Sequence, residues 1–100
     1  MNEYGLWIGG REIRTGRTIT VRIPYDGEPF ALIHTAGPAE LDAAIAAAYG
    51  ARAAMRALTS AERSAILYRA YGLMTERKET FGRTIASESG KPLREGLLEA

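Results

Sequence analysis

The sequence contains no cysteine, one histidine and one tryptophan among its 100 residues. The absence of cysteine excludes a disulfide framework, a thiolate metal site and a cysteine nucleophile within these residues. Thirteen basic and twelve acidic side chains leave a formal charge of +1. Because the two signs are interleaved along the chain, nothing favours nucleic acid as a partner. The longest apolar run, residues 43–51, is far shorter than the ~20 residues of a membrane span, so no membrane partner is predicted.

What remains is the composition of an ordinary globular protein, 46% hydrophobic and 25% charged. The length allows one domain at most, with a modest core. The first residues carry neither the basic nor the apolar segment of a secretory signal, which favours a cytoplasmic location.

The first third of the chain, residues 6–35, is predicted as antiparallel β-structure. Two short apolar segments flank Gly9-Gly10, and paired glycines accept the positive φ of a tight hairpin. Residues 18–23 alternate apolar and polar side chains, as in a strand buried on one side. Residues 24–27 form a turn, because proline and Asp-Gly favour one, and residues 30–35 are the next strand.

The remaining residues are predicted as two to four amphipathic helices. An alanine-rich helix begins at Pro38 and ends near residue 56. Thr59 and Glu62 have the spacing of a capping box, which starts a helix over residues 60–89 with a break near residue 78. Glycine follows its last residue, and residues 92–100 begin a further helix that continues to the end of the sequence.

The helix over residues 60–89 carries an apolar stripe at spacings of three and four residues. This periodicity predicts that one face is core and the other solvent. The stripe consists of Ile66, Leu67, Ala70, Leu73 and Met74.

Motifs that would carry chemistry are missing. No GxGxxG fingerprint occurs, and Gly90-Lys91 is not a P-loop, because its first glycine and its Ser or Thr are absent. His34 has no cysteine or second histidine with which to form a metal site, so it is interpreted as a structural or surface histidine. The residues themselves predict no catalytic and no cofactor-binding side chain.

The order of the motifs along the chain is more informative. Trp7-Ile8-Gly9-Gly10 is followed by a β-segment ending in Pro24-Tyr25-Asp26-Gly27-Glu28 and by the alanine-rich helix. Glu62-Arg63 with Ile66-Leu67, and then Glu88-Ser89-Gly90-Lys91-Pro92, complete the series. Together they resemble the N-terminal region of the NAD(P)-dependent aldehyde dehydrogenase superfamily. Residues 55–58 lack the tryptophan common there. Along with Pro24-Tyr25-Asp26-Gly27, this absence looks more like the lactaldehyde, phosphonoacetaldehyde and related branches than the betaine aldehyde branch.

The resemblance implies an α/β fold and an enzyme that oxidises an aldehyde to a carboxylic acid. In the family a cysteine forms a thioester, NAD or NADP accepts hydride, and a glutamate activates water. None of those residues matches a position here, so this segment alone is expected to be inactive and to bind no cofactor. Residues 1–100 are expected to be the N-terminal part of a longer enzyme, a homodimer or homotetramer.

One family site matches positions in this sequence. Some members hold a monovalent cation between backbone carbonyls, here those of Val21 and Arg22, and an acidic side chain, here Glu88. Hard oxygen ligands suit such an ion. The alternative is that Glu88 forms an ion pair with Arg83 or Lys91 on its own helix end.

A second hypothesis belongs to another class of protein. The chain would end at Ala100 and serve as a small, non-catalytic α+β interaction module. Leucines 93, 97 and 98 would then form an exposed apolar stripe that needs a partner.

Overall fold

The computed structural model describes all of residues 1–100, which form two compact units. Unit 1 consists of Met1–Val21 and Pro29–Ala57, and unit 2 of Arg22–Glu28 and Leu58–Ala100. The length of the chain predicted one domain at most, whereas the structure divides into these two units.

The main sheet of unit 1 has three strands in the order β1, β5, β4. β1 (Asn2–Tyr4) pairs in parallel with β5 (Pro29–His34), and β4 (Thr18–Arg22) lies on the other side of β5. The prediction of purely antiparallel strands beginning at residue 6 is wrong here. A strand of three residues is too short to show an alternating pattern, and its partner lies almost thirty residues further along the chain.

The second sheet of unit 1 is the predicted hairpin. β2 (Leu6–Ile8) and β3 (Arg11–Ile13) pair antiparallel, with Leu6 opposite Ile13 and Ile8 opposite Arg11. Gly9 and Gly10 both have positive φ, 59° and 77°, which the two-residue turn requires. The hairpin prediction is therefore confirmed.

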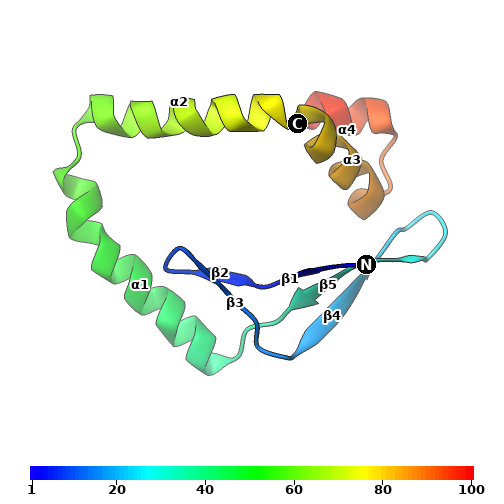
Figure 1. Cartoon of the computed structure of the whole chain (residues 1–100), viewed down its shortest axis with the longest axis horizontal. Helices are drawn as coiled ribbons and strands as arrows, with labels where there is room; N and C mark the ends of the chain where they lie inside the picture. The colour runs from blue at the N-terminus through cyan, green and yellow to red at the C-terminus, as the bar shows by residue number, and fades with distance from the viewer. The chain divides into compact units, whose positions relative to one another are not determined.

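Helix α1 (Pro38–Ala57) follows β5 and contacts β2 within the same unit (Figure 1). Its first turn is fixed by Glu40, whose carboxylate accepts the Gly37 N–H at 2.6 Å and the Arg17 Nη2 at 2.9 Å. These bonds satisfy a backbone donor that the helix itself cannot satisfy. The start of α1 is thereby joined to the segment that precedes β4.

Unit 2 contains α2 (Ser60–Glu76), α3 (Lys78–Ser89) and α4 (Leu93–Glu99). The capping box is confirmed: Thr59 Oγ1 accepts the Glu62 N–H at 3.1 Å, and Glu62 accepts the Thr59 N–H at 2.6 Å. The predicted break lies at Arg77, between α2 and α3. Gly90 caps α3 in the left-handed conformation, with φ 73°, as the glycine signal indicated.

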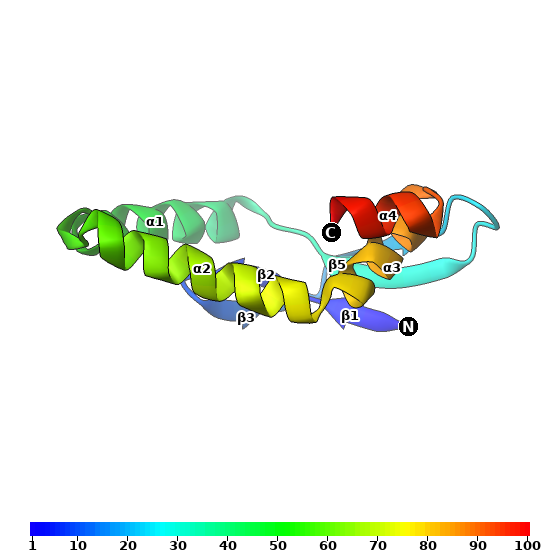
Figure 2. The same cartoon turned by 90° about the horizontal axis from the view of Figure 1, so that it is seen from above.

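Helices α3 and α4 lie side by side in both views (Figures 1 and 2). The two helices pack against each other at two buried glycines, Gly82 on α3 and Gly96 on α4. A Cβ on Gly96 would lie 2.4 Å from the Gly82 carbonyl oxygen, and a Cβ on Gly82 would lie 2.7 Å from Leu97 Cδ2. Only glycine at both positions permits this distance between the two backbones.

Very few side chains are buried within this chain. Ala31 and His34, both on β5, are the buried residues of unit 1's main sheet. The apolar stripe of α2 remains open, with Ile66 49% and Leu67 70% exposed, so the prediction that this face is core is not met by the described residues. Periodicity identifies an apolar face but not the element that covers it. None of the four helices combines the length and apolarity of a membrane span.

Candidate functional site

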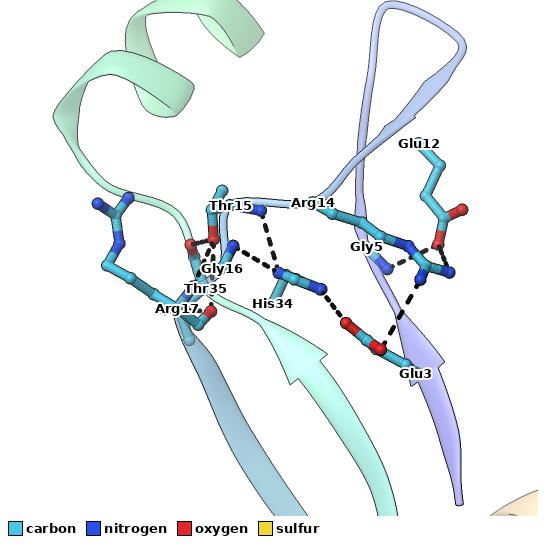
Figure 3. Close-up of polar contacts among 9 residues, drawn as sticks. All are labelled: Glu3, Gly5, Glu12, Arg14, Thr15, Gly16, Arg17, His34 and Thr35. Atoms are coloured by element: carbon cyan, nitrogen blue, oxygen red, sulfur yellow. Dashed lines mark hydrogen bonds and ion pairs between the residues drawn. The ribbon is translucent and has the colours of Figure 1, made fainter.

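The one buried polar side chain, His34, is the centre of a hydrogen-bonded cluster in unit 1 (Figure 3). It stands at the end of β5 and is 4% exposed. Its Nδ1 accepts the backbone N–H of Thr15 at 3.0 Å and that of Gly16 at 3.1 Å. Its Nε2 lies 2.6 Å from Glu3 Oε1 on β1. Because Nδ1 accepts, the proton of the neutral ring is on Nε2, which donates to Glu3.

Charged side chains extend the cluster toward the surface. Arg14 lies 3.7 Å from Glu3 and 3.7 Å from Glu12, and Glu12 accepts the Gly5 N–H at 2.8 Å. These side chains are more than a third exposed, so the two arginine contacts contribute little to stability. The cluster connects β1, β3, β5 and the segment before β4 (Figure 3).

The geometry makes His34 a structural residue, one of the two interpretations that the sequence allowed. Both ring nitrogens are engaged and the ring is buried, so it has no free nitrogen with which to act as a base on a substrate. Sequence reasoning missed its partner Glu3, which is 31 residues away. No local pattern signals a pairing across that separation.

Unit 1 has an open groove of about 420 Å³ between the β2–β3 turn and α1. It contains no charged side chain that could hold the phosphates of a dinucleotide, so the residues present do not fit such a cofactor. Its lining is Trp7, Ile8, Gly9, Gly10, Ala44, Ala47, Ala48 and Ala51.

The residues of the predicted cation site lie on two elements. Val21 is half-buried in β4, whereas Arg22, the last residue of β4, is exposed and donates from Nη1 to the Gly27 carbonyl at 2.9 Å. Glu88 is exposed on α3. No three His, Cys, Asp or Glu side chains gather in the chain, but that observation does not bear on carbonyl ligands. The cation site stays a prediction.

The alternative for Glu88, an ion pair near its helix end, is not observed. Arg83 binds Glu79 at 2.8 Å on α3 itself, and the Lys91 Nζ binds Glu99 on α4. Both basic side chains that were considered for Glu88 therefore have other acidic partners.

Comparison with known proteins connects this fold to one family. The model of the aldehyde dehydrogenase family matches residues 11–100. The chain is 37% identical over 89 residues to the mitochondrial succinate-semialdehyde dehydrogenase of Hylobates lar, which covers 89% of the chain and 17% of that protein. It is 39% identical over 94 residues to betaine aldehyde dehydrogenase of Cereibacter sphaeroides. This alignment covers 92% of the chain and 20% of that protein.

A solved structure extends the likeness to three dimensions. A NAD-dependent benzaldehyde dehydrogenase from Corynebacterium glutamicum is 38% identical and superposes with a TM-score of 0.86 over 93% of this chain and 21% of the other. The chain thus spans about a fifth of the length of the relatives it matches. A betaine aldehyde dehydrogenase is among these relatives, so they do not support the expected distance from that branch, and the lactaldehyde or phosphonoacetaldehyde branch stays a prediction.

Proposed function

The chain belongs to the aldehyde dehydrogenase family, and we propose that it is the N-terminal part of an enzyme that oxidises an aldehyde to a carboxylic acid with NAD or NADP. One observation carries the proposal. The fold and the sequence agree together, at a TM-score of 0.86 and 38% identity, with an enzyme described as a NAD-dependent benzaldehyde dehydrogenase. No comparable observation favours a non-catalytic module that ends at Ala100.

The contribution of these residues is structural in this proposal. The nicotinamide cofactor would supply hydride acceptance when bound, and in this proposal other parts of the enzyme form its site. The exposed stripe on α2, with Leu67 70% and Met74 47% exposed, supports this assignment, because monomeric proteins rarely leave large apolar patches open. We propose that other parts of the same enzyme cover this stripe.

The test compares the 100-residue chain with a longer polypeptide that contains it. Reduction of NAD and of NADP is followed by absorbance with a panel of aliphatic and aromatic aldehydes. We expect turnover by the longer polypeptide and none by the 100-residue chain, with circular dichroism establishing that both contain helix. Aldehyde oxidation by the 100-residue chain, or no oxidation of any aldehyde by a folded longer polypeptide, would contradict the proposal.

Three further parts of the proposal rest on the family resemblance or on the sequence. A homodimer or homotetramer is tested by sedimentation of the longer polypeptide. A cytoplasmic location is tested by cell fractionation, since the mitochondrial designation belongs to the relative that carries it. The monovalent cation at the carbonyls of Val21 and Arg22 and at Glu88 is tested by potassium-dependent thermal stabilisation, which Glu88→Gln should remove.

A further inference from the structure

The buried ring of His34 holds two separate segments of unit 1 at once. Toward one side it accepts two backbone N–H groups from Thr15 and Gly16, in the segment between β3 and β4. Toward the other it bonds the carboxylate of Glu3 on β1. Figure 3 shows the ring between these two sets of partners.

The two sides respond differently to a proton. A proton from solvent that binds Nδ1 forms an N–H bond on the nitrogen that two N–H groups already approach at 3.0 and 3.1 Å. The new ring N–H would then face the backbone N–H groups of Thr15 and Gly16. All three groups are donors, so no hydrogen bond can form among them. The bond to Glu3 is different, because Nε2 carries a proton in both the neutral and the charged ring, and a charged ring strengthens a bond to a carboxylate.

We propose that His34 is a proton-operated latch: the neutral ring holds the backbone at Thr15 and Gly16, and the charged ring releases it and keeps only Glu3. This device is independent of the proposed enzymatic function, since it requires only unit 1. In the closed state the ring is bonded to the Thr15 and Gly16 N–H groups, and in the open state these bonds are broken. The closed state binds one proton fewer at Nδ1 than the open state. Closure is therefore favoured while the ring is neutral, and it is lost when Nδ1 binds a proton as the pH falls.

The charged groups around the ring set the balance between the two states. Glu3 stabilises the charged ring, and Arg14, 3.7 Å from the same carboxylate, reduces that effect. The other charged pair at this segment joins it to α1 and does not reach the ring. The full set is Glu3 on β1, Glu12 on β3, Arg14 and Arg17 in the segment between β3 and β4, and Glu40 on α1.

Two other bonds in the same segment are independent of the ring and serve as an internal control. The Thr35 N–H donates to the Arg17 carbonyl at 2.8 Å, and Thr15 Oγ1 donates to the Thr35 carbonyl at 2.9 Å. Neither involves a titrating atom. Release by the ring should therefore open the amides of Thr15 and Gly16 and leave the amide of Thr35 closed.

The experiment follows the full chain by NMR from about pH 8 to about pH 5. Long-range ¹H–¹⁵N correlation gives the tautomer and charge of the His34 ring, and amide hydrogen exchange gives protection factors for Thr15, Gly16 and Thr35. We expect the Nε2–H tautomer at pH 8. As the ring becomes charged, protection at Thr15 and Gly16 should fall about tenfold or more, with Thr35 unchanged. An Nδ1–H tautomer, constant protection, or equal loss at Thr35 would overturn the proposal.

Two variants separate the latch from simple packing. His34→Gln retains an acceptor and a donor but cannot titrate, so exchange at Thr15 and Gly16 should lose its pH dependence. Glu3→Gln keeps the ring and an acceptor for Nε2, so release should still accompany protonation of the ring. The Glu3→Gln variant keeps the proposal testable if His34→Gln does not fold. The proposal would be overturned if exchange at Thr15 and Gly16 stayed pH-dependent in His34→Gln, or if release in Glu3→Gln did not follow protonation of the ring. Glu62→Gln in unit 2 is the control, and it should change neither the ring's protonation nor exchange at Thr15 and Gly16.

Discussion

Gly96 fixes how closely α4 approaches α3, and Gly96→Ala tests that packing. The added Cβ would lie 2.4 Å from the Gly82 carbonyl oxygen, 3.3 Å from its carbonyl carbon and 3.4 Å from the Ala86 nitrogen. All three are backbone atoms of α3, so no side-chain rotation relieves the contact. Ordinary contact begins at 3.4 Å, and the two helices must therefore separate by about 1 Å.

The magnitude follows from two opposing effects. Overpacking of this kind costs about 1–3 kcal/mol. Alanine in place of glycine within a helix returns up to about 1 kcal/mol. With the full helix gain, the net loss in the free energy of unfolding is about 0–2 kcal/mol, which corresponds to a fall of at most roughly 16 °C in Tm.

The assay is urea and thermal unfolding followed by circular dichroism, with amide exchange in α4 to detect local separation of the helix. Gly72→Ala is the matched control, because Gly72 lies in α2 of the same unit and a Cβ there meets nothing within 4 Å. We expect the control to gain about 0.5–1 kcal/mol. The reasoning is refuted if Gly96→Ala is as stable as Gly72→Ala.

Three other predictions concern the ends of elements. Thr59→Ala removes one half of the capping box and should cost about 0.5–2 kcal/mol in the unfolding free energy, measured by urea titration, whereas Ser60→Ala should cost less. The Gly37 N–H lowers the pKa of Glu40, and the Thr59 N–H lowers the pKa of Glu62, from the usual 4.5. As the pH falls, the unfolded chain therefore binds protons at these carboxylates before the folded chain does. The contribution of the two groups to stability should be full above about pH 4.5 and should decrease below it, as measured by thermal unfolding. The decrease should be less steep in Glu40→Gln and Glu62→Gln. Gly5→Ala should destabilise the β2–β3 hairpin, because its Cβ would lie 2.7 Å from the Ile13 carbonyl oxygen; unchanged amide exchange in β3 would contradict this.

The features that the sequence predicted correctly are those encoded by neighbouring residues. The capping box at Thr59 and Glu62, the glycine cap at residue 90 and the Gly9-Gly10 turn each need only a few adjacent side chains, and each is present. The family was predictable for a related reason, since a series of such local motifs in order is itself a signature.

The features that were missed depend on residues far apart in the chain. The strand at residues 2–4 is defined by its pairing with β5, and the environment of His34 is defined by Glu3 and by the Thr15 backbone. Periodicity correctly marked the apolar face of α2, but what covers a face is a property of tertiary structure. The cation site at Val21, Arg22 and Glu88 depends on backbone carbonyls, which carry no sequence signal of their own, and it stays a prediction.

The parallel pairing of β1 with β5 has a consequence for the order of folding. The β2–β3 hairpin joins residues a few positions apart and can form in about 1–10 μs. Asn2 must instead pair with Ala31, which closes a loop of almost thirty residues. The entropic cost of closing this loop is offset only when both strands are ordered enough to form their hydrogen bonds. The first strand of the chain is thus expected to be among the last to form. Substitutions in β1 should then accelerate unfolding and leave the folding rate nearly unchanged.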